Sequence, residues 1–297
     1  MKHLATLLFI LFCGVGVMGQ SVLEYTLQKD DVFTIQQNAE QIITQELDGA
    51  SHVITNNIDG ILEFKVLAER DSAYDIALTF KDLNLKMTSS IQGELMNVSA
   101  KTVDEDNMQS KVFGSLLNRP VQVRLAKNGD ILEVTGGDSL VSKMAAASGL
   151  EDEFSLNMMK KSLKKEFGSE ALSNSYEQMT FIYPKKPVDV GDSWENAYKG
   201  KLSATNNWTL EALSDEEGSI SGTANITMDV TEMATTMKLS GTQQTKITTE
   251  PSSGFMKKMT VEGESKGVST MTQMGDQEIP TTIKSTITYE LMDGVIE

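Results

Sequence analysis

The sequence predicts a mainly β protein with an α insert: a long, curved antiparallel sheet, similar to half of a barrel, with about three short helices inserted mid-chain. Apolar residues recur with period two from residue 21 to 134, and the period changes between residues 138 and 180. Period two returns after residue 188. Period two is typical of half-buried strands, whereas spacings of three and four residues are typical of helices. We therefore expect an N-terminal β region (20–136), a helical insert (137–183) and a C-terminal β region (184–297) in one composite domain.

The N-terminal region shows strand patterns separated by turn residues. Its first strand places Phe33, Ile35, Ala39, Ile43 and Leu47 on one face. Asp-Gly pairs at 48–49 and 59–60 predict turns, and Asn-Gly-Asp at 128–130 predicts a tight hairpin between strands 121–125 and 131–134. Strands of about 10 to 16 residues are long, so the sheet is expected to be strongly twisted or curved.

The insert carries helix start and stop signals. Asp138 or Ser139 is expected to cap a first helix that stops at Gly149. A second helix opens with acidic residues at 151–153 and ends in lysines before Gly168, which complements the helix dipole. A third starts at Ser169. The apolar residues that we expect to line a ligand site on these helices are Met144, Leu156, Met159, Leu163, Phe167, Leu172 and Met179.

The C-terminal region is rich in Thr and Ser and alternates again over residues 220–230, 235–249, 255–263, 268–274 and 281–291. Landmarks between residues 31 and 87 weakly resemble those between 192 and 237. Either a duplicated β unit or chance similarity between polar strands explains this internal similarity.

The first 19 residues resemble an export signal. Lys2 and His3 precede an apolar run from residue 4 to 12, and Val17 and Gly19 stand before Gln20 as a cleavage site requires. Phe12 before Cys13 disfavours lipidation, because lipoprotein signals have a small residue there. No later stretch approaches the roughly 20 apolar residues of a membrane-spanning helix. We expect an exported, periplasmic or extracellular protein that does not span a membrane, with its signal cleaved near Gly19–Gln20.

Composition restricts the chemistry. After Gln20 the chain has no cysteine and a single histidine, His52, which disfavours nucleophilic catalysis and zinc sites. The acidic cluster at residues 104–107 lacks the spacing of a calcium loop, and a solvated loop explains it better. Aromatic residues are 6% of the chain, which argues against stacking of sugars in a glycosidase. We therefore predict a non-enzyme, with no catalytic residue, cofactor or metal.

Nucleic acid, anionic membrane surfaces and copper(I) are also disfavoured as partners. The net charge is −16 and basic residues occur in no run longer than pairs, so nucleic acid and anionic membrane surfaces are not expected as partners. Methionine is abundant, and Met256 and Met259 could suggest copper(I). Residues three apart on a strand point to opposite faces, so this pair is not expected to chelate one ion.

Several features together carry a resemblance: Gln20 after the cleavage site, the hairpin VQVRLAKNGDILEVTG at residues 121–136, the helical insert, and the segment from Pro184 to Trp194. The chain resembles an uncharacterised family of exported proteins from Bacteroidota-type bacteria, known only as a domain of unknown function. This resemblance implies an envelope location and a β-rich fold, with no catalytic residue to transfer. The architecture is more distantly similar to the lipoprotein-carrier half-barrels of the bacterial envelope.

The leading functional hypothesis is binding of an apolar ligand, a lipid or acyl chain, between the concave sheet and the helices. Amphipathic helices must cover something apolar, and a long sheet offers a face to cover. The alternative is a structural or protein-interaction role in the cell envelope without a ligand.

Overall fold

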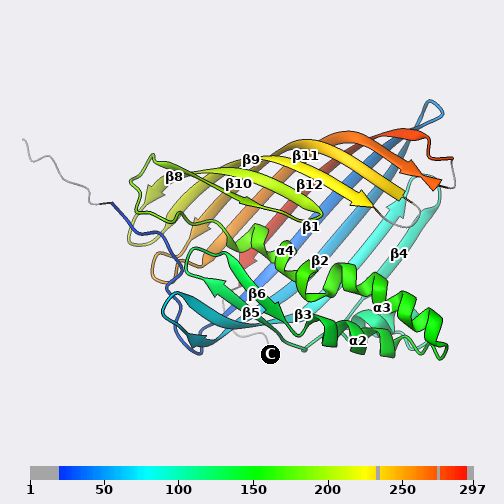
Figure 1. Cartoon of the computed structure of the whole chain (residues 1–297), viewed down its shortest axis with the longest axis horizontal. Helices are drawn as coiled ribbons and strands as arrows, with labels where there is room; N and C mark the ends of the chain where they lie inside the picture. The colour runs from blue at the N-terminus through cyan, green and yellow to red at the C-terminus, as the bar shows by residue number, and fades with distance from the viewer. Residues whose placement is uncertain (1–19, 232–234, 273–274, 293–297) are drawn as a thin grey trace, which may run out of the picture.

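The computed structural model describes residues 20–231, 235–272 and 275–292, so the predicted export signal (1–19) lies outside the described residues. In this part of the chain, one twelve-stranded antiparallel sheet curls around a group of helices (Figure 1). The prediction of a mainly β fold with a mid-chain helical insert is confirmed.

The sheet contains strands from both β regions. The N-terminal strands are β1 (Val32–Leu47), β2 (Ala50–Glu69), β3 (Ala73–Ser89), β4 (Gly93–Ser99), β5 (Val121–Ala126) and β6 (Ile131–Thr135). The C-terminal strands are β7 (Ser193–Tyr198), β8 (Leu202–Leu213), β9 (Gly218–Thr231), β10 (Thr235–Thr249), β11 (Met256–Met271) and β12 (Glu278–Leu291). The helices are α1 (Met108–Gly114), α2 (Gly137–Ala147), α3 (Glu153–Phe167) and α4 (Ser169–Thr180).

The strand order joins the two β regions at the centre of the sheet. The order is β6-β5-β3-β2-β1-β12-β11-β10-β9-β8-β7, and β4 pairs with β3 outside this path. Strand β1 pairs with β12 from Ile35 opposite Leu291 to Gln45 opposite Thr281. Since the first and last strands are central neighbours, β6 and β7 are left as the edges of the curled sheet.

Helix α4 lies between these two edges, and its C-terminal end is bonded to both. Thr180 Oγ1 donates to the carbonyl of Gly129, in the β5–β6 turn, over 2.7 Å. From β7, Asn196 Nδ2 donates to the Phe181 carbonyl over 2.7 Å. Gly129 has φ +92°, and a Cβ there would lie 1.7 Å from the Thr180 carbonyl oxygen, so only glycine fits this contact. We call this junction of α4 with β5, β6 and β7 the seam.

Helix boundaries follow local capping, with one correction. Asp152 caps α3 by accepting a hydrogen bond from the Ser155 amide over 2.8 Å, and Lys164 and Lys165 occupy its last turn, as the charge order predicts. The predicted cap of α2 by Asp138 or Ser139 is wrong: the helix begins at Gly137 after Gly136, which adopts φ +92°, and Asp138 lies in the first turn. A left-handed glycine supplies the sharp entry that a capping side chain would otherwise stabilise.

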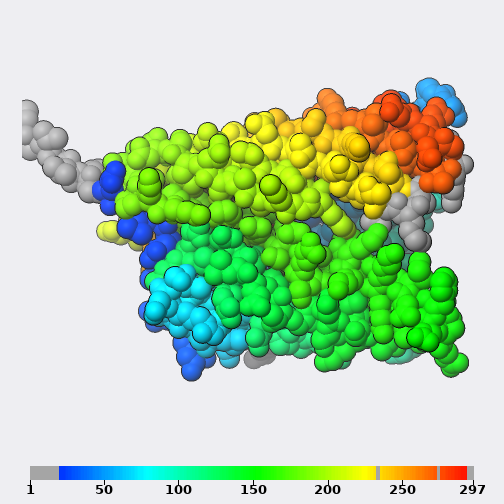
Figure 2. Space-filling view, in the orientation of Figure 1, coloured from blue at the N-terminus to red at the C-terminus, as the bar shows by residue number. Residues whose placement is uncertain are grey.

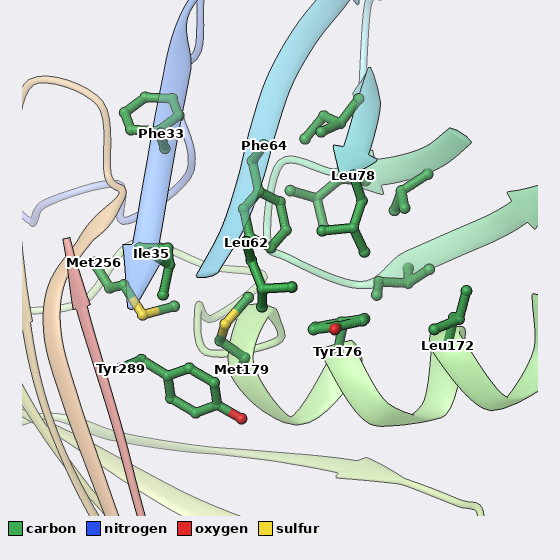
Figure 3. Close-up of a cluster of buried hydrophobic side chains, with 14 of the residues drawn as sticks. Phe33, Ile35, Leu62, Phe64, Leu78, Leu172, Tyr176, Met179, Met256 and Tyr289 are labelled. Carbon is green, nitrogen blue, oxygen red and sulfur yellow. The ribbon is translucent and has the colours of Figure 1, made fainter. Parts of the chain in front are cut away.

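The helices pack on the concave face of the sheet and complete one core with it. Figure 3 shows Tyr176 and Met179 of α4 facing Leu62 and Phe64 of β2, with Leu172 further along the helix. The Phe64 and Tyr176 rings meet edge to face with centroids 6.4 Å apart. The core draws buried side chains from both β regions and from the insert. Burial of the apolar faces of α2–α4 against the sheet therefore holds the insert in place.

Two sequence-based inferences about strands need correction. The predicted turn at Asp59–Gly60 is wrong, because β2 continues through it while β1 and β3 pair with it on both sides. Met256 and Met259 do not point to opposite faces. The register of β10 with β11 skips Lys257, and this bulge turns both methionines into the core, where 1% and 0% of their surface is exposed.

One helix was missing from the sequence interpretation. The acidic segment at residues 104–107 leads into α1, whose N-cap is Asn107; its side chain accepts from the Ser110 amide over 3.2 Å. Asp104 Oδ1 accepts from the Asp106 amide over 3.0 Å. These oxygens thus stabilise a local turn and a helix start. In the described part of the chain, no three His, Cys, Asp or Glu side chains converge as metal ligands would.

Candidate functional site

The concave face has one end that is filled with side chains. Phe33 stacks on Phe255 with centroids 4.1 Å apart, and Tyr25 and Phe64 meet Phe255 edge to face. The Tyr74 hydroxyl donates to the Tyr25 carbonyl over 2.9 Å. Burial raises the pKa of the Tyr25 phenol well above its usual value, so this aromatic cluster stays uncharged. This end of the molecule is solid core.

The seven apolar helix residues predicted to line a ligand site are gathered against this core. Leu163, at 9% exposure, is the most exposed of the four that are buried. Phe167 meets Phe80 of β3 edge to face, with centroids 6.2 Å apart. The structure therefore brings these side chains together and packs them against the sheet, whereas contact with a ligand stays a prediction. The buried members are Met144, Leu163, Leu172 and Met179; Leu156, Met159 and Phe167 are partly buried.

Open space on the concave face lies further along the sheet, beyond α4. A pocket of about 290 Å³ is lined by residues of β1, β2, β3, β4 and β12. Figure 2 shows the molecule hollowed between the yellow strands and the green helices. Apolar side chains that point into the pocket are only half-buried there, which leaves them available to a ligand. They are Ala39, Ile58, Leu85, Met87, Met96 and Ile287.

Polar side chains share the floor of this pocket. Gln41 and Asn56 face each other in the register of β1 and β2, and Asn56 Nδ2 donates to Gln41 Oε1 over 3.1 Å. Ser285 of β12 lies opposite Gln41 on the other side. Asn56 Oδ1 is buried, and no donor among the described residues reaches it. A buried acceptor without a partner is costly, so this oxygen favours a partner from outside the chain.

A second opening lies at the seam. It has a volume of about 700 Å³ and is lined by Asp130, Glu177, Trp194 and the segment from Pro184 to Pro187. Burial raises the pKa of Glu177 to about 7, and the nearby charge of Asp130 and a hydrogen bond between the two carboxyl groups act in the same direction. The two carboxyl groups are thus close enough to share a proton.

A third opening, of about 490 Å³, lies between α3, α4 and the β7–β8 turn. Lys161, Lys164, Lys165 and Lys201 line it. Lys201 pairs with Glu166, and Lys164 Nζ lies 3.1 Å from Asp138 Oδ2. Acidic residues thus offset part of the positive charge, and the lining is that of a solvated helix surface.

The one histidine after Gln20 lies at the far end of the sheet from the aromatic cluster. His52 Nε2 is 2.9 Å from Ser89 Oγ. That oxygen also accepts from the amides of Ile91 and Gln92, both over 3.1 Å, so it holds the turn after β3. The described helices are all too short or too polar to cross a membrane.

Sequence reasoning missed the strand residues of the 290 Å³ pocket. A signal was present: in β1 the odd positions carry Phe33 and Ile35, and the same alternation places Gln37, Gln41 and Gln45 on that face. Polar residues on an apolar face indicate a hydrated or ligand-contacting stretch. The partner Asn56 depends on the register of β2 and could not be assigned from the sequence.

Comparison with solved structures finds one chain of similar fold and two weaker matches. A structure describing lipid–protein interactions in lipovitellin has a TM-score of 0.51 and 13% identity over 92% of this chain. The match covers 26% of that chain, so this chain spans about a quarter of its length. DynF from the dynemicin biosynthesis pathway of Micromonospora chersina has 7% identity and a TM-score of 0.25, with 94% of this chain and 88% of that chain covered. An outer membrane channel from Pseudomonas putida F1 has 6% identity and a TM-score of 0.26, with 90% and 97% covered. The last two are too dissimilar to carry an argument.

Sequence comparison gives a family without an assigned activity. No curated protein matches the chain. The model of a family of unknown function, DUF6263, matches residues 71–256, which is 186 of the 297 residues. The matched part runs from the start of β3 to the start of β11 and contains the whole helical insert. The chain belongs to this family of unknown function, DUF6263.

Proposed function

We propose that this protein binds an apolar or amphipathic ligand, such as a lipid or an acyl chain, on the concave face of its sheet. The observation that carries the proposal is the pocket of about 290 Å³, in which inward-facing apolar side chains remain half-buried. Its volume is at the lower end of the range for small-molecule sites and suits a single chain. The helices cover the neighbouring part of the concave face and shield the ligand from one side.

The fold likeness to lipovitellin supports the same proposal. That structure describes lipid–protein interactions, and its similarity to this chain extends over 92% of the residues here. A curled sheet encloses apolar volume without needing a separate domain to cover it. Since folds do not determine function, the pocket carries the proposal and the likeness supports it.

In this proposal, the protein is not an enzyme and acts after export. One histidine and no cysteine after Gln20 support the absence of nucleophilic chemistry, and the N-terminal segment supports export. Binding and release of the ligand would therefore be the whole activity.

A matched pair of substitutions on β12 tests the site. Ser285 points into the pocket, while its neighbour Thr286 points to the outer face and is exposed. Ser285→Phe fills the pocket, so the affinity for the apolar dye N-phenyl-1-naphthylamine, measured by fluorescence titration, should fall at least about tenfold, as for loss of a buried apolar contact. Thr286→Phe should leave the affinity unchanged.

Native mass spectrometry of protein purified from its host provides the second readout. The wild type should carry a hydrophobic mass that Ser285→Phe lacks. Equal dye affinity in both variants and the wild type, with a bare polypeptide mass, would refute binding at this pocket. Circular dichroism confirms that both variants are folded.

A further inference from the structure

A row of polar side chains crosses the concave face from β2 to β7, perpendicular to the strands. Each residue of the row is the register partner of the next, with Gly263 of β11 and Ala224 of β9 at the two positions without a polar group. The polar members are Asn56, Gln41, Ser285, Gln243, Asn206 and Asn196.

The adjacent row on the same face is apolar. Two residues away along each strand, Ile58 faces Ala39, and Ala39 faces Ile287. Both rows contribute to the floor of the 290 Å³ pocket. The pocket floor therefore places the amide groups of Gln41 and Asn56 beside apolar side chains, as a site for an amphiphile requires.

The two ends of the polar row differ in their hydrogen bonding. At the β7 end, Asn206 Nδ2 and Trp208 Nε1 both donate to Asn196 Oδ1 over 3.0 Å, and Asn196 in turn donates to Phe181 of the seam. At the β2 end, Asn56 donates to Gln41, but Asn56 Oδ1 meets no donor in the described chain. The amide groups at the β7 end are therefore bonded within the protein, whereas the β2 end has one acceptor that is available to a ligand.

A second unpaired acceptor lies on β1, at Gln45, four residues beyond Gln41. Gln45 is 3% exposed, and its Nε2 donates to Ser269 Oγ over 2.9 Å. Its Oε1 has no donor within the described residues. The rise of a strand separates positions 41 and 45 by about 13 Å. The concave face thus presents two acceptors without donors among the described residues, one on Asn56 of β2 and one on Gln45 of β1.

The lack of inward-pointing charged side chains in the pocket lining argues against a ligand with an ionic head group. Among the residues that line the pocket, only Glu40 and Lys86 are charged, and strand alternation turns both toward the outer face. Lys86 Nζ also lies 3.9 Å from Glu94 Oε2. A carboxylate or phosphate would be desolvated here without a partner, which is strongly unfavourable.

We propose that the pocket selects a neutral amphiphile with one apolar chain and a hydrogen-bond donor, a hydroxyl or an amide N–H, as its head group. The head donates to the amide pair of Gln41 and Asn56, and the chain lies along Ile58, Leu85 and Ile287. This assignment rests on the proposed function and adds the class of ligand. Fatty alcohols and monoacylglycerols share this chemistry.

The test compares four ligands with the same ten-carbon chain: decan-1-ol, decyl methyl ether, decanoate and decylammonium. Affinities are measured by displacement of N-phenyl-1-naphthylamine. The alcohol should bind about five- to tenfold more tightly than the ether, the effect of one hydrogen bond to an otherwise unpaired acceptor. Both ions should bind more weakly than the alcohol.

A double variant removes both amides of the pair, so that neither is left without its hydrogen-bond partner. Gln41→Met with Asn56→Leu replaces both partners by apolar groups of similar shape, which is far milder than removing one. The ratio of alcohol to ether affinity should fall to about one, while the ether binds at least as well as before. Two like substitutions on the outer face of β1, Gln36→Met with Asn38→Leu, lie outside the pocket lining; they are the control and should keep the wild-type ratio.

The outcomes separate the two proposals. If the alcohol and ether bind wild type equally, or if decanoate binds best, or if the double variant keeps its selectivity, the head-group assignment is wrong and apolar binding stands. Water filling the site at Asn56 Oδ1 would give the first of these results. If none of the four ligands displaces the dye, the proposed function itself fails.

Discussion

At the scale of single residues, Glu177 connects the seam to pH. It lies on α4 within hydrogen-bonding reach of Asp130, and burial followed by the neighbouring charge raises its pKa to about 7. An acid with a raised pKa binds more protons in the folded than in the unfolded state between its ordinary pKa of 4.5 and 7. Its contribution to stability is therefore fully present below about pH 4.5 and is lost as the pH rises through 7.

Glu177→Gln should remove this pH dependence. The amide stays neutral and can still bond to Asp130, so the variant should be more stable than wild type at pH 8. The expected difference is about 1 kcal/mol, because solvent screens a half-exposed group. The two should be equally stable near pH 4.5. Urea unfolding at pH 4.5, 6 and 8 measures the difference. Glu170→Gln, in the exposed first turn of the same helix, is the control; a flat difference across this range would contradict the shared proton.

The residues of the pocket show what a sequence can and cannot reveal about a site. Alternation alone places Gln41 and Gln45 on the same face as Ile35, so their inward direction was readable. Their partners were not: Asn56 and Ser269 lie 15 and 224 residues away from the glutamines that they contact. Strand register and the curl of the sheet, which depend on every strand at once, bring these pairs together.

At the scale of elements, the three helices of the insert were predictable, whereas α1 and parts of the long strands were not. The start of α3 after its N-cap Asp152 and its end before Gly168 follow from local capping and charge. The failed turn at Asp59–Gly60 has a physical cause. Pairing of β2 on both sides along its length outweighs the local turn preference of two residues.

The attachment of α3 to the sheet gives a prediction about one element. Leu163 is the buried residue of this helix, so Leu163→Ala should lower the free energy of unfolding by about 2 to 5 kcal/mol, through lost burial and the cavity left behind. Phe154, on the same helix, is 76% exposed. Phe154→Ala should therefore change the stability by less than about 0.5 kcal/mol. Equal effects of the two substitutions in urea unfolding would show that α3 does not pack on the sheet.

At the scale of the whole molecule, one large core and one sheet link distant parts of the chain. The pairing of β1 with β12 connects the first and last strands, and the seam ties α4 to both edges of the sheet. The two tryptophans, Trp194 and Trp208, lie at the β7 edge of the sheet, so their fluorescence reports on that edge. Trp194 Nε1 donates to the Ile182 carbonyl over 3.0 Å, and Trp208 is 3% exposed. Loss of the insert should thus expose these rings even though they lie on β7 and β8.

The expected result is a single cooperative unfolding transition. Tryptophan fluorescence, which follows β7 and β8, and far-ultraviolet circular dichroism, which follows all helices and strands, should give the same urea midpoint. Leu163→Ala lies on α3, away from both tryptophans, and should lower the two midpoints by the same amount because the core transmits the loss. If the helical insert were a separate unit, this substitution would shift the dichroism midpoint and leave the fluorescence midpoint in place. Coincident shifts would establish that the sheet and its inserted helices fold as one composite domain.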